Sequence, residues 1–172
     1  IVMDPKTGDI LAMASTPDYD PNYPRMPLTS GGAVYVESLS DQEKLDYWNA
    51  MWRNPLVSDT YEPGSTFKLL TTSIALEEGV THLDDNFVCT GHITVAGQRL
   101  KCWRSYNPHG SQNLVEAVGN SCNPVFVQLA QRTGYETYFD YMELFGLYEK
   151  TGIDYPGEGY AILQSEETAG PV

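Results

Sequence analysis

Short apolar runs and turn residues alternate at the start of the chain. Two apolar runs, residues 2–4 and 10–14, flank the segment Pro5-Lys6-Thr7-Gly8. Proline and glycine between two such runs are typical of a β-hairpin turn. Residues 15–38 are rich in Pro, Asp, Tyr and Gly, which indicates an irregular surface segment. The pattern therefore predicts a hairpin followed by a long loop.

Capping signals and helical spacing predict two helices next. Ser40-Asp41-Gln42-Glu43 has the form of a capping box, and it opens a helix that runs to about Trp52. A second helix follows Pro63-Gly64 and runs from Ser65 to about Glu78, with Gly79 placed to end it. The first helix carries three apolar residues on one face, Leu45, Trp48 and Trp52. The second helix carries three in a stripe that we expect to be buried, Phe67, Leu70 and Ile74.

The second half of the chain reads as a hairpin and further helices. Residues 87–102 alternate weakly around Ala96-Gly97 and predict a hairpin. Residues 114–119 predict a short helical turn. A helix then runs from Pro124 to Arg132, since proline is favoured at a helix start, and a last helix covers about 135–145.

Composition and charge limit the possible functions. The chain has 172 residues, of which 41% are hydrophobic, and its formal net charge is -13. This is the composition of one ordinary globular domain. Nucleic-acid binding needs a basic face, so we expect no nucleic-acid partner. The chain starts inside an apolar segment and stops in a polar one, and we interpret it as a piece of a longer protein.

Ser65 and Lys68 have the form S-x-x-K at the predicted start of a helix. Positions i and i+3 share a helix face, so the Lys68 amine can reach the Ser65 hydroxyl. A serine is a poor nucleophile until a base takes its proton, and a partly buried lysine with a lowered pKa can be that base. Taken alone, the pair also fits a helix cap and a solvated lysine.

A second short motif, Ser121-Cys122-Asn123, precedes Pro124. Its hydroxyl could relay a proton to a leaving amine, and its amide could hold the lysine and a substrate peptide group. The same triplet also fits a capping turn, with Asn123 as the cap before Pro124. Both interpretations can hold together.

Longer blocks around these motifs resemble the transpeptidase domain of class B penicillin-binding proteins, most of all the division and sporulation type of Gram-positive bacteria. The resemblance covers essentially the whole chain, and its blocks are far more specific than S-x-x-K. They are Met3 to Met13, Arg53-Asn54, Tyr61 to Lys68, Ser121 to Pro124, Thr151 to Asp154, and Pro156 to Glu158.

The resemblance implies an α+β fold of the serine β-lactamase/transpeptidase type, an antiparallel sheet flanked by helices, here truncated with the inner strands missing. The whole of 1–172 would be one partial penicillin-binding transpeptidase domain. Ser65 would attack the carbonyl of a D-Ala-D-Ala stem peptide, and Lys68 would accept its proton. Ser121 would protonate the departing D-Ala, and Asn123 would orient the substrate. No cofactor would be needed for catalysis.

The resemblance also implies partners and a location. Peptidoglycan stem peptides and β-lactam antibiotics would acylate the same serine, and division or sporulation membrane proteins would bind the parent protein. The domain would act in cell-wall synthesis on the extracytoplasmic face of the bacterial membrane, anchored by a segment outside this chain. Alternatives are a β-lactamase or β-lactam sensor of the same fold, for which no deacylating base is evident, and a non-enzymatic scaffold.

Lys150-Thr151-Gly152 matches the letters of the family's third motif, which should lie on an inner strand. Here the triplet stands in a Gly/Pro-rich segment after a helix, with no strand-like run beside it. We interpret it as a chance match. The chain would then lack one wall of the cleft, and we expect it to be inactive or nearly so as an isolated polypeptide.

The chain has three cysteines, and a histidine falls between the second and third. Together they follow the order Cys89, Cys102, His109, Cys122. Three thiolates and an imidazole can fill a tetrahedral structural zinc site, and pairing of the predicted hairpin would bring Cys89 close to Cys102. A Cys102–Cys122 disulfide and three buried free thiols are the alternatives that the sequence leaves open.

Overall fold

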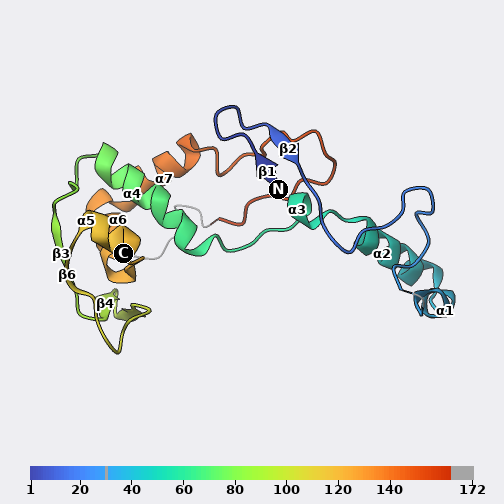
Figure 1. Cartoon of the computed structure of the whole chain (residues 1–172), viewed down its shortest axis with the longest axis horizontal. Helices are drawn as coiled ribbons and strands as arrows, with labels where there is room; N and C mark the ends of the chain where they lie inside the picture. Colours follow the sequence, from blue (N-terminus) through green and yellow to red (C-terminus); the bar gives the residue numbers. More distant parts are fainter. Residues whose placement is uncertain (30, 164–172) are drawn as a thin grey trace. The chain divides into compact units, whose positions relative to one another are not determined.

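The computed structural model describes residues 1–29 and 31–163 (Figure 1). They form two compact units. Among the described residues, the first unit comprises 1–29, 31–60 and 150–160, and the second comprises 61–149 and 161–163. Helices and short antiparallel strands occur in both units, as the predicted α+β class requires.

The predicted hairpin at the start of the first unit is present. β1 (Val2–Met3) pairs antiparallel with β2 (Ile10–Ala12). Gly8 in the connecting turn has a φ of 81°, which glycine adopts without strain. The segment predicted to be irregular contains one short helix, α1 (Gly32–Glu37). No capping signal in the sequence predicted α1, because Gly31 at its N-cap has no side chain to make one.

Helix α2 (Asp41–Trp52) begins where the capping box predicted. The Ser40 side chain accepts a hydrogen bond from the backbone N–H of Glu43, and the Glu43 carboxylate accepts one from the N–H of Ser40. No residue of α2 is fully buried. A further short helix, α3 (Pro55–Ser58), was not predicted as a separate element.

Lys150-Thr151-Gly152 lies in a loop of the first unit and not in a strand. The backbone N–H and the hydroxyl of Thr151 both donate to the Glu158 carboxylate, at 2.7 and 2.6 Å. The expected loop context is confirmed. The triplet therefore has none of the strand surroundings that a carboxylate-binding third motif would need.

The helices of the second unit follow the prediction closely. They are α4 (Lys68–Glu77), α5 (Leu114–Gly119), α6 (Asn123–Thr133) and α7 (Tyr135–Leu144). α6 packs against both α4 and α7 (Figure 1). The main difference is at the start of α4, where the helix predicted from Ser65 opens as a 3-10 helix, η1 (Gly64–Phe67). Tight turns of this kind are common at helix ends.

The strands of the second unit pair differently from the prediction. β4 (His92–Val95) and β5 (Gln98–Lys101) form a hairpin around Ala96-Gly97, as expected. The hairpin is shorter than predicted, because β3 (Asn86–Cys89) pairs instead with β6 (Gly110–Asn113). β6 is a polar segment without an apolar alternation, so no strand was predicted there.

An apolar cluster holds the helices and β3 together in the second unit. Leu114 and Leu129 are 1% and 0% exposed, and all three cysteines belong to the same cluster. Ile74 in α4 is fully buried, while Phe67 and Leu70 are half-buried. The predicted stripe is therefore fully buried at its last residue, Ile74, and partly buried at the other two.

Candidate active site

The η1–α4 helix presents Ser65 and Lys68 one turn apart. Ser65 is exposed in η1, and Lys68 is the half-buried first residue of α4. The Lys68 ammonium lies 5.1 Å from the centre of the Phe126 ring. Burial lowers the pKa of Lys68 below its ordinary value of 10.5, while the charges of the Cys122 and Cys102 thiols act in the opposite direction. Burial therefore favours the neutral amine that a base requires.

The turn at Ser121 is the C-terminal cap of α5. Ser121 has a φ of 49°, and the N–H of Cys122 donates to the carbonyl of Ala117 at 3.1 Å. This is a Schellman-type ending, in which glycine is usual at the left-handed position. A serine there costs about 1–2 kcal/mol. The strain is concentrated at the residue whose hydroxyl and carbonyl both face Lys68.

Helix α6 begins directly after this turn, with Cys122 as its N-cap. The capping interpretation of the triplet placed Asn123 at the cap, and that assignment is wrong by one residue. Because Asn123 is the first helical residue, its amide does not serve as the cap. Its Nδ2 donates to the backbone carbonyl of Lys101, at the end of β5, at 3.0 Å. Lys101 thus fixes the amide from the strand side, which the sequence did not indicate.

The structure brings all four predicted catalytic and substrate-binding residues together. Lys68 Nζ donates to Ser121 O at 2.9 Å, to Ser121 Oγ at 2.9 Å and to Asn123 Oδ1 at 2.6 Å. Ser121 Oγ donates to Ser65 Oγ at 3.0 Å. Among the contacts of the described residues, Ser121 stands between Lys68 and Ser65. The sequence predicted that the amine reaches Ser65 directly, and the structure instead links them through a second hydroxyl.

This hydrogen-bond pattern fits a proton relay. A neutral lysine amine has two N–H groups and one lone pair. Ser121 O and Asn123 Oδ1 are oxygens that only accept, so they would take both N–H groups. The lone pair would then face the Ser121 hydroxyl, which could donate to it while accepting from Ser65. A proton can pass along this row from Ser65 to Lys68 without any change in the heavy-atom positions.

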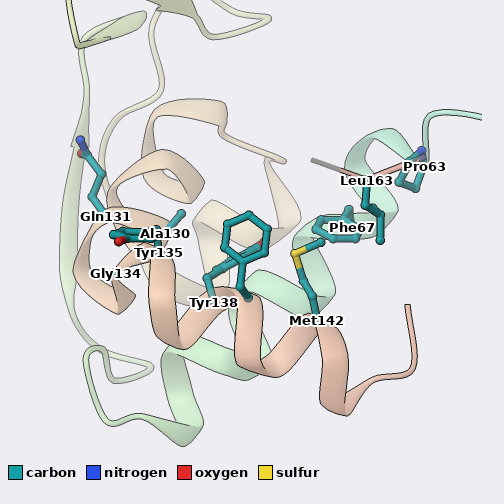
Figure 2. Close-up of a pocket in the computed structure, with 10 residues that line it drawn as sticks. Pro63, Phe67, Ala130, Gln131, Gly134, Tyr135, Tyr138, Met142 and Leu163 are labelled. Carbon is teal, nitrogen blue, oxygen red and sulfur yellow. The ribbon is translucent and has the colours of Figure 1, made fainter. Parts of the chain in front are cut away.

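An apolar cavity of about 700 Å³ lies in the second unit beside the turn that carries Ser65 (Figure 2). Figure 2 shows Phe67 of η1 together with Tyr138 and Met142 of α7 on its wall. The sequence did not reveal this cavity, because its walls come from segments that are far apart along the chain. The nucleophile turn therefore borders an open apolar recess.

The four predicted metal ligands also come together. Their ligand atoms, one from each residue, all lie within 4.8 Å of one another: Cys89, Cys102, His109 and Cys122. The approach of Cys89 to Cys102 is confirmed, although β3 reaches it by pairing with β6 and not within the hairpin. All three cysteines are free and buried, so the Cys102–Cys122 disulfide considered from the sequence is not formed in this structure.

Fold and site together define an α+β protein with a serine and a lysine one helical turn apart, both facing a second serine. The chain belongs to the penicillin-binding protein transpeptidase domain family, whose family model matches residues 1–170.

Several curated relatives match the whole chain, among them the following two. Stage V sporulation protein D of Bacillus subtilis is 44% identical, and the chain covers 24% of that protein. A peptidoglycan D,D-transpeptidase, PbpA of Mycobacterium tuberculosis, is 33% identical, and the chain covers 33% of it. The chain thus spans about a quarter of the length of one relative and about a third of the other.

A solved structure shares the fold. Pseudomonas aeruginosa PBP2, crystallised in complex with WCK 5153, matches with a TM-score of 0.74 and 29% identity. The match covers 96% of this chain and 36% of that one. Within residues 1–29 and 31–163, no helix has both the length and the apolar character needed to span a membrane.

Proposed function

We propose that this chain supplies the nucleophile side of a peptidoglycan D,D-transpeptidase. The observation that carries the proposal is the row of hydrogen bonds from Lys68 through Ser121 to Ser65. A serine that is activated by a neighbouring base can act as the nucleophile in acyl transfer. Family membership and the name of the mycobacterial relative support the choice of reaction. They favour a transpeptidase over a β-lactamase, a β-lactam sensor or an inactive scaffold.

In the proposed acylation step, Ser65 Oγ attacks the carbonyl carbon of the penultimate D-Ala of a stem peptide. Its proton passes through Ser121 to the neutral Lys68, and a tetrahedral intermediate forms. The C–N bond to the terminal D-Ala then breaks, and Ser121 delivers a proton to the departing amine while Lys68 replaces it. Asn123 holds Lys68 and orients the substrate amide. The product is an acyl-enzyme ester and free D-Ala.

The second half-reaction reverses these roles. The amine of a neighbouring stem peptide attacks the ester, gives its proton to the Ser121–Lys68 pair, and forms the cross-link. The proton returns to Ser65 as the ester breaks. A β-lactam would acylate the same oxygen through its strained amide. The amine of the opened β-lactam ring would stay attached to the acyl group and would not leave the site, so the ester would persist.

The proposal places residues 1–172 in one partial transpeptidase domain. The rest of that domain would add the inner strands, the third motif and the second wall of the cleft. The protein would act outside the cell membrane, held by an anchor beyond this chain, with division or sporulation membrane proteins as partners. The isolated chain is then expected to be inactive or nearly so.

The proposal is tested by labelling the full-length protein with a fluorescent penicillin and mapping the adduct by mass spectrometry. We expect a single ester on Ser65, and little labelling of the isolated 172-residue chain. An adduct on another residue would overturn the assignment of the nucleophile. Strong labelling of Ser65 in the isolated chain would contradict the view that the missing wall is required.

Two substitutions at Ser121 separate its hydroxyl from its backbone conformation. Ser121→Ala and Ser121→Gly both remove the hydroxyl between Lys68 and Ser65, and we expect each to slow penicillin acylation by about 10²–10⁴-fold. Glycine adopts a φ of 49° without strain. The free energy of unfolding of Ser121→Gly should therefore be about 1–2 kcal/mol higher than that of Ser121→Ala. Acylation rates and denaturant unfolding measure the two effects. Acylation that recovered in the more stable variant would argue against the relay.

A further inference from the structure

The hairpin formed by β4 and β5 has one basic face. Because side chains alternate across a strand, Arg99 and Lys101 of β5 lie on the same face of the hairpin. Their cross-strand partners in β4, Thr94 and His92, share that face. Arg99 Nη2 lies 3.3 Å from His92 Nδ1, and it donates to this nitrogen because a guanidinium has no acceptor. This contact places Arg99 and His92 side by side.

The opposite face of the hairpin is mostly apolar and partly buried. Ile93 and Val95 of β4 are half-buried, whereas Arg99 and Lys101 of β5 are exposed. Helix α6 packs against both strands (Figure 1). The apolar face therefore supplies the packing of the hairpin, and packing within the second unit does not explain the two exposed cations.

A third cation follows β5 along the chain. The Arg104 guanidinium lies 5.9 Å from the centre of the Trp103 ring, a cation–π distance. We call Arg99, Lys101 and Arg104 the basic strip. Within residues 1–29 and 31–163, none of these three side chains forms an ion pair with a carboxylate. Their charges are therefore available to a ligand.

The basic strip contrasts with the charge of the whole chain. The chain has 10 Lys and Arg against 23 Asp and Glu, and its formal net charge is -13. Residues 86–115 contain the three cations of the strip and no Asp or Glu. An acidic protein repels an anionic ligand over most of its surface, and a local group of cations attracts it. The strip is therefore a favourable place for an anion on the second unit.

The basic strip borders the S-x-N turn at two points. The Lys101 carbonyl accepts a hydrogen bond from Asn123 Nδ2 at 3.0 Å. Trp103 Nε1 donates to the Asn120 carbonyl at 2.9 Å, and Asn120 immediately precedes Ser121, whose hydroxyl contacts the proposed nucleophile. A peptide whose end reacts at the nucleophile can therefore extend over the strip.

We propose that the basic strip binds carboxylates of the substrate peptide that lie outside its D-Ala-D-Ala end. This inference rests on the proposed function, because it concerns the substrate of the same site. Ser65 acts on the end of the peptide while the strip holds carboxylates further along it. Arginine can take a carboxylate through two parallel N–H donors, and lysine adds a point charge. A peptide with free carboxylates is then favoured over one with carboxamides.

Turnover of two synthetic peptides by the full-length protein tests the proposal. Both peptides end in D-Ala-D-Ala, and one has two further carboxylates where the other has carboxamides. Release of D-Ala, with a fixed concentration of an amine acceptor, gives kcat/KM for each. At low salt we expect a preference of about 10-fold for the carboxylate peptide, which shrinks as ionic strength rises. Equal values at low salt would overturn the proposal.

Charge reversal locates the preference on the hairpin. Arg99→Glu together with Lys101→Glu should abolish the preference for the carboxylate peptide, mainly by raising its KM. The matched control is Lys6→Glu together with Arg25→Glu, which changes the net charge equally at exposed positions of the first unit. The control should keep the preference, and its loss there would overturn the assignment to the strip. The comparison of the two peptides on the wild type does not depend on any variant folding.

Equilibrium binding separates this proposal from the transpeptidase proposal. Ser65→Ala should bind the fluorescently labelled carboxylate peptide more tightly than the carboxamide peptide. That result, in a protein that no penicillin acylates, would contradict the proposed function and leave the strip standing. Penicillin acylation of Ser65 with equal binding of both peptides would leave the proposed function standing and overturn the role of the strip. A strip that binds inorganic polyphosphate and neither peptide would also overturn it.

Discussion

Ser65→Ala in the full-length protein is expected to abolish covalent labelling by a fluorescent penicillin. The variant loses the oxygen that the proposed mechanism acylates, while the Ser121 hydroxyl stays beside Lys68 at its own position. The loss should therefore be complete within detection and not a partial slowing. Denaturant unfolding should change little, since Ser65 is exposed and its hydroxyl supports no buried contact.

The matched control is Ser73→Ala. Ser73 is an exposed serine of the same helix, and its hydroxyl donates to the Leu69 carbonyl at 2.9 Å. It should label like the wild type. In cells, Ser65→Ala should also abolish the cross-linking that depends on this protein. Unchanged cross-linking with Ser65→Ala would favour the scaffold hypothesis and contradict the enzyme.

Lys68→Arg is expected to slow acylation by about 10²–10⁴-fold, the usual contribution of a general base. The substitution keeps the positive charge and the donors toward Ser121 and Asn123. An arginine cannot give up its proton in a protein, so it cannot receive one from Ser65. The variant thus removes the base function while preserving the charge, and the rate of labelling under single-turnover conditions measures the loss.

The pH profile checks the same assignment. Burial lowers the pKa of Lys68 below its ordinary value of 10.5, so the neutral amine forms at lower pH than in a free lysine. The acylation rate of the wild type should rise with pH through this lowered pKa and level off above it. The rise should vanish in Lys68→Arg. Lys150→Arg, in the loop triplet of the first unit, is the control and should keep the wild-type profile.

Local signals along the chain were sufficient to place most helices. The capping box at Ser40 marked the start of α2, and Pro124 and Gly134 bracketed α6. These features depend on residues only a few positions apart, so they can be recognised from the sequence alone. β6 is one of the elements that were not predicted, and it has no such signal, because a polar strand is stabilised by its partner β3 and not by its own residues.

The candidate site also has features that the sequence predicted and features that only the structure shows. The sequence identified Ser65, Lys68, Ser121 and Asn123 through their motifs, and it identified the cysteines and His109 through their residue types. It predicted a direct contact between Lys68 and Ser65. The structure instead inserts the Ser121 hydroxyl, because the left-handed turn at the end of α5 pushes this residue toward the amine. Such a turn depends on backbone contacts that no motif records.

The order of residues alone indicated the family, most helix starts, and the side chains proposed to carry the chemistry, because each of these depends on spacing within one turn or one short block. Tertiary packing decided how distant segments meet. It placed Lys101 against Asn123, paired β3 with β6, and drew three cysteines and a histidine to one buried point. Those contacts arise when separated segments bury a common apolar cluster, so they become visible only once the chain is folded.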